Sequence, residues 1–457
     1  MVSDTLRADA GSTAFLARSV DALEGLVASP PTVSPARPAE APGVSPDSAV
    51  RDGHLWQVDI IRLLTFAAVI LVHALAFTEE PTDGVAAGLM MVLQFGREVF
   101  FALTGFVLVY SCMGRTLRAR SFWRKRFLYV GVPYVVWTVV YYGFSFVSGP
   151  HPPFSWATLG DDLINGNAEY HLYFLLVSME LYLVFPLVMR FVRATAHRAL
   201  LVLAVVGSLN VAWLAALQWF SGPSGWGGFL WTHAYELLPT YAIYVLAGCY
   251  TAVHLEKILA VLRANRRRLI IGSLGGLLFT EMAFLLQTMW MDPRSANNPL
   301  QPAMIVCSAS VVILLAVVGD IWASGNRAGL PAIRRASDIS FGVYLLHPVI
   351  LTLLCNAGLG NNVGHLPSAA ATALAVPGTA VGAVVVCLML RRSPFALPLI
   401  GRAWVRPDRQ LRSLRENLAQ ILRVPADPER SGRALVASVS PLCPSDRPNL
   451  QTSFRSG

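Results

Sequence analysis

The sequence alternates between long apolar runs and short polar loops. Most runs approach the length of about 20 residues that an α-helix needs to cross the hydrocarbon core of a bilayer. Backbone groups inside a bilayer must be hydrogen-bonded within their own segment, so we expect these runs to be helical. The pattern predicts an all-α, polytopic membrane protein with about ten transmembrane helices, at residues 55–77, 85–112, 127–147, 171–192, 198–220, 234–253, 269–290, 301–323, 339–358 and 366–390.

Polar segments flank this apolar region at both ends. Residues 1–54 are rich in Pro, Ala and Ser, a composition typical of disordered tails. Residues 391–457 are polar and basic, and we expect their first part to lie as a helix against anionic lipid headgroups and their last part to be disordered. The sequence therefore predicts a transmembrane domain over 55–390 between two tails.

The loops differ in charge, and this difference predicts their orientation. Residues 113–126 contain several arginines and a lysine but no acid, whereas the only charged residues of 148–170 are acids. The same alternation continues through the later loops. Since positively charged loops stay in the cytoplasm, we expect both tails to be cytoplasmic and the protein to be a multi-pass protein of the cell (plasma) membrane.

Composition supports the membrane assignment and excludes other classes. Of the 457 residues, 54% are hydrophobic and only 14% are charged, whereas soluble domains have about 25% charged residues. The net charge of +9 comes from arginines in short loops and not from a basic stripe, so no nucleic-acid partner is expected. The six cysteines form no CxxC pair, and neither a disulfide framework nor a metal site is expected.

The first apolar run contains an arginine and a histidine eleven positions apart, Arg62 and His73. In an α-helix, eleven residues return to within about 20° of the same face and rise about 16 Å. Asp59 precedes Arg62 by three residues and joins this face. Ionisable groups in a membrane are costly and usually face a protein interior or a wet cavity. The predicted orientation places Arg62 near the cytoplasmic side and His73 near the external side.

Other predicted spans also contain ionisable groups. Arg97 and Glu98 are adjacent in the second run, and because adjacent helical positions do not face each other, we expect each to find a partner on another helix. His171 opens the fourth span at about the depth expected for His73. The further groups of this kind are Glu180 in the fourth span and Tyr344 and His347 in the ninth.

Each of these groups also has a structural explanation. Asp59 and Arg62 can form an ion pair between helices, and His347 can satisfy carbonyl groups that Pro348 leaves free. Arg124 and Arg126 can serve membrane topology alone. The aromatic residues expected in the belt at the membrane interface are Tyr170, Tyr173, Trp226, Trp231 and Trp290. A functional site is favoured because a passive bundle has no need of several ionisable groups in separate helices.

Several segments resemble the motifs of one enzyme family, in the order in which that family has them. The Arg62–His73 spacing matches an Arg-X10-His signature, and Phe100–Phe106 resembles an FFxxSGF segment with threonine in place of the usual serine. Three later matches lie within residues 122–134, 171–186 and 340–347. In these features the chain resembles the membrane-bound acyltransferase-3 family, whose members transfer acyl groups to sugars and other hydroxyl compounds.

This resemblance implies an integral membrane O-acyltransferase. It would move an acyl group, expected to be acetyl, from acyl-CoA to a hydroxyl of a sugar, glycan or related compound, with acyl-CoA as co-substrate and no bound cofactor. The catalytic residues would be His73, as general base or acyl carrier, with Arg62 and Glu180. Arginines would bind the donor's phosphates, namely Arg62, Arg124 and Arg126. The supporting residues would be Asp59, Glu98, His171, Tyr344 and His347, with Glu98 a second candidate to orient His73.

A transporter or exporter of a polysaccharide or lipid-linked sugar is the main alternative. It too would place charges at mid-bilayer. The sequence contains no evident inverted repeat, which disfavours this alternative. A structural or sensory membrane protein is disfavoured by the number of buried charges. The acceptor and the acyl chain length stay open at the level of sequence.

Overall fold

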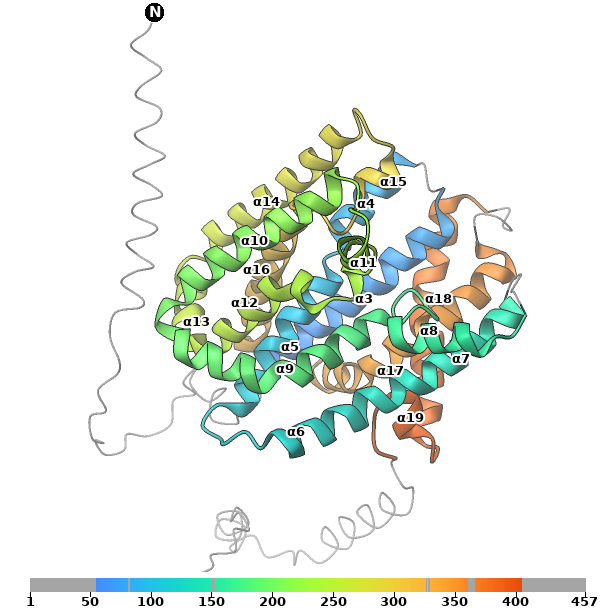
Figure 1. Cartoon of the computed structure of the whole chain (residues 1–457), viewed down its shortest axis with the longest axis horizontal. Coiled ribbons are helices and arrows are strands. Elements are labelled where there is room, and N and C mark those ends of the chain that lie inside the picture. Colours follow the sequence, from blue (N-terminus) through green and yellow to red (C-terminus); the bar gives the residue numbers. More distant parts are fainter. Residues whose placement is uncertain are drawn as a thin grey trace, which may run out of the picture. The chain divides into compact units, whose positions relative to one another are not determined.

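The computed structural model describes residues 55–80, 83–148, 153–325, 327, 329–360 and 366–404, and these residues form helices without a strand (Figure 1). The tail predicted over 1–54, and residues 405–457 of the tail predicted over 391–457, lie outside them. The longer helices are α3 (Trp56–Thr78), α4 (Gly84–Leu93), α5 (Gly96–Cys112), α6 (Ala119–Arg126), α7 (Val132–Ser148), α8 (Trp156–Asn165), α9 (Tyr173–Thr195), α10 (Ala199–Trp219), α12 (Ala242–Val253), α13 (Leu255–Ala264), α14 (Arg266–Gln287), α16 (Ala303–Ser324), α17 (Leu330–Leu354) and α18 (Ser368–Arg391). The short elements are η1 (Phe127–Gly131), η2 (Ala196–Arg198), α11 (Trp226–Thr232), η3 (Ala234–Glu236), η4 (Leu238–Tyr241), α15 (Pro293–Ala296), η5 (Cys355–Leu359) and α19 (Ala396–Ile400).

The all-α, multi-pass architecture is confirmed. Among the described residues, eight helical segments are long and apolar enough to cross a membrane, or nine if the bent pair of Leu238–Val253 and Leu255–Ala264 is one span. The predicted number of about ten is higher because the fourth and fifth predicted spans, α9 and α10, join through η2 into one continuous segment, Tyr173–Trp219. Each of the two helices alone, with 23 and 21 residues, has the length of a span.

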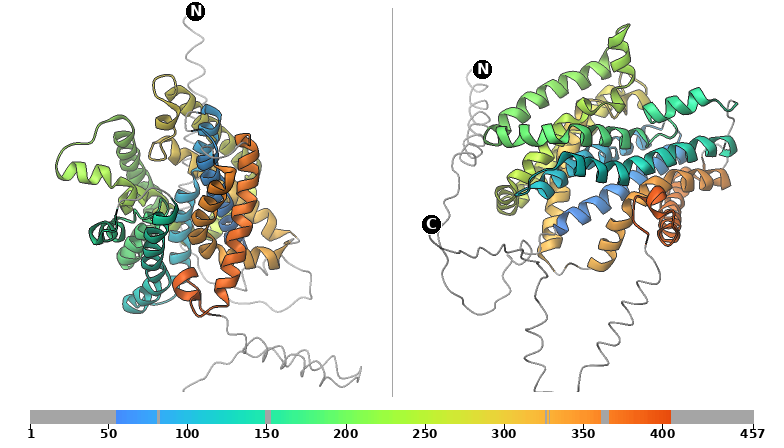
Figure 2. Two further views of the ribbon diagram at one scale, coloured as in Figure 1. Left: turned by 90° about the vertical axis from the view of Figure 1, so that its right-hand side faces the viewer. Right: turned by 60° about the horizontal axis from the view of Figure 1, so that its bottom comes forward.

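Helix α3 is the centre of the bundle. It packs against α4, α5, α16, α17 and α18, which come from both ends of the described chain (Figures 1 and 2). This position explains why a single apolar helix can carry Asp59, Arg62 and His73, since neighbours surround it and shield these groups from lipid.

The second predicted span is broken. Helix α4 ends at Leu93 and α5 begins at Gly96, which lies close to α3. A Cβ atom at Gly96 would come 2.7 Å from Cγ2 of Val69, so only glycine allows this approach. The break places Arg97 at the start of α5, inside the bundle.

Helices α5 and α12 pack closely through small residues. A Cβ atom at Gly105 would collide with the carbonyl oxygen of Val245, and one at Gly248 with that of Ala102. Glycine contacts of this kind let membrane helices approach at backbone distance. The contact fixes the start of α12, and η3 and η4 before it, beside Arg97.

The region between the sixth and seventh predicted spans is helical and not a loop. Helix α13 follows α12 at an angle of 92°. It buries Leu262, and Arg263 bonds the fully buried Asp320 of α16, as does Arg266 from the start of α14. The pattern of one apolar face and one basic face explains why this segment folds as a helix lying across the bundle.

The segment after α18 begins with the short apolar helix α19. It packs against α7, α17 and α18, and the indole of Trp137 donates a hydrogen bond to the carbonyl of Leu399 (2.8 Å). Arg402 then bonds both the backbone carbonyl and the carboxylate of Asp338. The described start of this tail is therefore anchored to the bundle.

Candidate active site

Three histidines from separate parts of the chain meet inside the bundle. His73 lies on α3, His171 just before α9, and His347 on α17. The imidazole centroids of His73 and His171 each lie 5.4 Å from that of His347. The common depth expected for His73 and His171 is thus observed as direct proximity, and His347 joins them.

The proton position on His347 follows from its partner. Nδ1 of His347 lies 2.6 Å from the carbonyl oxygen of Tyr344. A carbonyl can only accept, so Nδ1 carries the proton of the neutral ring and Nε2 keeps its lone pair. The hydroxyl of Tyr344 in turn donates to the backbone carbonyl of His171 (2.6 Å), which ties α17 to the start of α9.

Several buried polar atoms in this cluster have no hydrogen-bond partner among the described residues. They are Nε2 of His347, both ring nitrogens of His171 and the hydroxyl of Tyr170. His347 is fully buried and His171 is 3% exposed. Buried polar atoms nearly always have partners in native proteins, and several orphans in one place indicate a site that a ligand or water completes.

The cluster borders a cavity of about 610 Å³ between α3, α5, α9 and α17. His73 and His171 line it together with Tyr170, whose ring lies 4.4 Å from that of His73. Arg97 and Tyr173 also line this cavity. This volume suits a small-molecule site, since such sites commonly occupy about 300–1,000 Å³.

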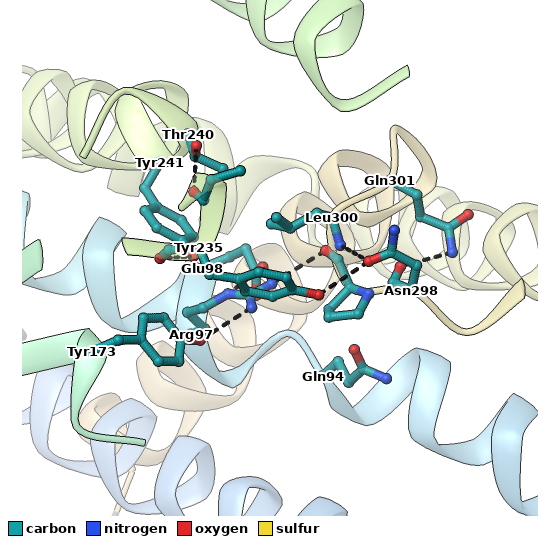
Figure 3. A network of polar contacts seen from close by, with 12 residues as sticks. Gln94, Arg97, Glu98, Tyr173, Tyr235, Thr240, Tyr241, Asn298, Leu300 and Gln301 are labelled. Atoms are coloured by element: carbon teal, nitrogen blue, oxygen red, sulfur yellow. Dashed lines mark hydrogen bonds and ion pairs between the residues drawn. The ribbon is translucent and has the colours of Figure 1, made fainter. Parts of the chain in front are cut away.

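Arg97 and Glu98 form a buried network with three neighbouring segments (Figure 3). Arg97 has the expected partner on another helix, Tyr173 of α9, but the two adjacent side chains also pair directly, because the Arg97 guanidinium binds the Glu98 carboxylate at 2.6 Å. The two long side chains bend back toward each other above the first turn of α5. Arg97 also donates to the hydroxyl of Tyr173 (3.2 Å) and to the carbonyl of Pro299 (3.2 Å).

Aromatic rings complete this network. The Arg97 guanidinium lies 5.5 Å from the ring centroid of Tyr235 and 5.4 Å from that of Tyr241. A buried ion pair is stable only when further contacts satisfy its remaining donors and acceptors. One carboxylate oxygen of Glu98 has no partner, so the network is satisfied on the arginine side and incomplete on the acid side.

The other end of α3 holds Arg62 in a different setting. Arg62 donates to Oγ of Ser337 (3.2 Å), and Ser337 donates to Oδ1 of Asp59 (2.7 Å). Asp59 and Arg62 share one face of α3 as expected, and Ser337 of α17 bridges them. Nearby on the chain, Asp338 pairs with Arg391 at 2.5 Å.

Glu180 is not placed to orient His73. Its Oε2 accepts a hydrogen bond from the backbone N–H of Leu238 (2.8 Å), at the start of η4. It is absent from the lining of the histidine cavity among the residues described between 55 and 404. Glu98 likewise bonds Arg97, so the interpretation that either acid orients His73 has no support in the geometry.

Of the three arginines assigned to the donor, Arg124 and Arg126 lie on α6. Arg124 is exposed, whereas the guanidinium of Arg126 lies 5.6 Å from the ring centroids of both Phe122 and Tyr182. Arg126 thus stands on an aromatic platform that α6 and α9 share, in a cation–π arrangement.

A small cavity of about 60 Å³ lies beside the histidine cavity, and Tyr182 is part of its lining. Both cavities are lined by the same four aromatic residues, Phe66, Phe100, Phe174 and Tyr344. The rings of Phe100 and Phe174 are in edge contact at 4.3 Å. These four rings separate the histidine cavity from the side where Arg126 lies.

Three site residues carry no direct signal in the sequence. Tyr170 and Tyr173, expected in the interfacial belt, instead contact His73 and Arg97. Ser337 was not distinguished from other small polar residues. For Tyr170, the one available signal was its position next to His171.

Glu169, two residues before His171, lies in an apolar setting outside the spans. Its burial raises the pKa of the carboxyl to about 7, and the backbone N–H of Tyr170, 3.3 Å from Oε1, opposes this shift. Its protonation therefore changes near neutral pH.

Together, the fold and the cavity define a multi-pass helical membrane protein with an interior imidazole site. A family model described as an acyltransferase domain matches residues 55–392. The chain belongs to the membrane-bound acyltransferase-3 family and is a membrane acyltransferase. No curated protein and no solved structure gave a match.

Proposed function

We propose that the protein transfers an acyl group, acetyl in the simplest case, from acyl-CoA to a hydroxyl of a sugar, glycan or related compound at the cell membrane. The observation that carries the proposal is the cavity of about 610 Å³ where imidazole nitrogens lack partners. A hydroxyl is a weak nucleophile at neutral pH, and a neutral imidazole beside it can take its proton as the new bond forms.

His73 is the proposed base because it lines the cavity directly. The imidazole accepts the acceptor's proton, the hydroxyl oxygen attacks the thioester carbon, and the bond to the CoA sulfur breaks. The thiolate then takes the proton from the imidazolium, which restores neutral His73. In the alternative order, the His73 nitrogen attacks the thioester carbon first, the CoA thiolate leaves and takes a proton from the imidazole, and the acyl-imidazole then passes the acyl group to the hydroxyl while the released imidazole takes the hydroxyl proton.

His171, His347 and Tyr344 are proposed to position this base. The Tyr344 carbonyl holds the proton of His347 on Nδ1, so the lone pair of Nε2 is available within the cluster. Arg97, on the cavity wall, supplies positive charge in the chamber where the thioester oxygen becomes negative. Glu98 holds Arg97, and Asp59 holds Arg62 through Ser337.

The donor is proposed to enter from the opposite side, which is cytoplasmic in the predicted orientation. Arg62, Arg124 and Arg126 would bind its phosphates, for which guanidinium groups are well suited. About 16 Å along α3 separates Arg62 from His73, so the extended arm of the donor would span that length. The small cavity beside Tyr182 and the four aromatic rings lie along this route.

Acyl-CoA turnover tests the proposal. Full-length protein in nanodiscs would be given acetyl-CoA labelled in the acetyl group and a panel of soluble glycans, with transfer followed by mass spectrometry. We expect labelled acceptor with the wild-type protein and none above background with His73→Ala. Glycan movement across sealed vesicles without any acyl transfer would contradict the proposal and favour an exporter.

A further inference from the structure

A second large cavity adjoins the histidine cavity. It has a volume of about 860 Å³ and lies among the end of α10, η3 and the segment between α14 and α16. Tyr235 and Pro299 line both cavities, so one wall separates them. The two spaces together can hold a ligand longer than either one.

The lining of this second cavity is mostly polar. It carries side-chain amides, a carboxylate, a guanidinium and two aromatic rings, chiefly Gln218, Tyr235, Trp290, Asp292, Arg294 and Asn298. By contrast, a cavity of about 320 Å³ between α3, α5, α12 and α16 is lined almost entirely by aliphatic side chains. The polar lining is thus particular to the space beside the histidines.

An amide network holds this lining in place (Figure 3). The amide of Asn298 donates to Gln218 (2.7 Å) and its oxygen accepts from the hydroxyl of Tyr235 (3.1 Å). Gln218 donates to Gln287 (2.7 Å), and Gln287 to Gln301 (2.7 Å). Binding sites need such outer contacts to hold the groups that touch the ligand.

The network also reaches the histidine cavity. Gln94, which lines that cavity, donates to Asn297 of the second cavity (2.7 Å), and its own carbonyl oxygen is buried without a partner. The guanidinium of Arg97 lies over the ring of Tyr235 on the shared wall. The polar contacts therefore run without interruption from one chamber to the other.

The residues around the opening are exposed, and one of them also has a structural role, since Asp292 caps α15 by accepting a hydrogen bond from the backbone N–H of Ser295 (3.0 Å). Trp290 is 64% exposed, and Arg294 and Asp292 are exposed beside it. Side-chain amides and charged groups offer both donors and acceptors to hydroxyl groups, and an indole face packs against the apolar face of a sugar ring. A polar chamber with an aromatic edge is a suitable site for a polyhydroxylated ligand and a poor one for an alkyl chain.

We infer that the second cavity binds a further sugar unit of the acceptor, next to the unit whose hydroxyl is acylated at His73. This inference rests on the proposed acyl transfer but concerns a separate chamber. The acceptor is then an oligosaccharide or glycan with at least two units, gripped in the polar chamber while its end projects past Tyr235 into the histidine cavity.

Sugar binding without catalysis tests this inference. The probes are N-acetylglucosamine, glucose and their dimers and trimers, titrated by calorimetry into full-length protein in nanodiscs. We expect the dimer of one series to bind about tenfold more tightly than its monomer, and Trp290→Ala to remove this gain, since loss of a central aromatic contact commonly costs that much. Trp226→Ala, which changes another exposed tryptophan (85% exposed) that does not line the cavity, should keep this gain.

The outcomes separate this inference from the proposed function. If neither series binds, or if Trp290→Ala binds the dimer as tightly as the wild type, the second site is refuted while acyl transfer can still stand. If the wild-type protein binds the dimer with the expected gain, and Trp290→Ala loses that gain, while the wild type transfers no acyl group to any acceptor, the second site stands and only the catalytic proposal is refuted.

Discussion

The two ends of α3 show how the same kind of costly residue can have opposite surroundings. At the Arg62 end, Arg62, Ser337 and Asp59 form a continuous hydrogen-bonded chain. At the His73 end, imidazole nitrogens of His171 and His347 are buried without partners beside a cavity. Since buried polar groups are almost always satisfied, the groups at the first end are held by the protein itself, whereas those at the second end are left for a ligand or water to satisfy.

Helix α17 makes this contrast possible. It supplies Ser337 to the Arg62 end and His347 to the His73 end, so α3 and α17 run side by side in the same direction. Ser337 and His347 are ten residues apart on α17, and Arg62 and His73 are eleven residues apart on α3. Both separations correspond to about 15–16 Å along the helix. One helix pair therefore fixes the distance between the two polar sites.

The largest expected effect is at the histidine end. His73→Ala should lower the rate of acyl transfer by about 10²- to 10⁴-fold, because a positioned base is lost. If the three histidines act as one unit, His73→Ala combined with His347→Ala should lose no more than the more damaging single variant. Rates of single-turnover acyl transfer measure both.

His254 provides the matched control for this experiment. It is a histidine outside the cluster whose ring bonds the carbonyl of Ala196 (3.1 Å). His254→Ala should keep the wild-type rate. If the rate losses of the two single variants multiply in the double variant, His347 acts independently of His73. The histidines would then not form one functional unit.

A smaller effect is expected at the arginine end. Arg62→Gln should raise the KM for acyl-CoA about tenfold, through the loss of a charged contact to a phosphate, and should also lower the Tm, because Asp59 loses part of its network. Arg263→Gln breaks a comparable contact to the buried Asp320 away from the histidine cavity and should change the Tm without the KM. Steady-state kinetics and thermal unfolding separate the two quantities.

This comparison decides whether the Arg62 end is functional. If Arg62→Gln lowers the Tm but leaves the KM for acyl-CoA at the wild-type value, the arginine end is only a structural tie between α3 and α17. The donor's phosphates would then have to be bound by α6 alone.

The smallest expected effect concerns Glu169, two residues before His171 at the histidine end of α3. The folded protein raises the pKa of Glu169 from 4.5 to about 7, so the folded state favours the protonated acid. Stability from this group is complete below pH 4.5 and is lost as pH rises through about 7. Glu169→Gln should therefore raise the Tm at pH 8 by about 2–4 °C and leave it unchanged at pH 4.5.

Thermal unfolding at the two pH values checks this, with Glu80→Gln, an exposed acid, as the control. An equal shift at both pH values would mean that the effect comes from packing and not from titration. It would also indicate that the carboxyl of Glu169 is more hydrated than its burial suggests.

Much of the architecture could be predicted from the pattern of apolar runs. The period and length of each run are local properties, so α3, α14, α16 and α18 lie close to their predicted ranges. The errors occurred where tertiary contacts overrode the local pattern. The segment 254–268, predicted as a loop, contains α13, whose apolar face buries Leu262 against the bundle.

The candidate site was predictable only in part, for a related reason. His73, His171 and His347 were recognisable because each is costly in an apolar helix. Their partners were not, since Tyr170, Tyr173 and Ser337 are unremarkable as residue types. Glu180 had the right chemistry at a plausible depth, yet its carboxylate bonds the backbone of Leu238.

The sequence by itself determined that this protein is an all-α membrane protein, that Arg62 and His73 share a helix face, and that the chain resembles its family. These properties depend on hydrophobic period, residue spacing and motif order within short segments. Only the tertiary structure decided which imidazoles meet, that Arg97 pairs with its neighbour Glu98, and that a polar chamber adjoins the histidine cavity. Contacts between helices join residues far apart in the sequence, such as Asp59 and Ser337, which are 278 positions apart, and no local pattern encodes which helix faces which.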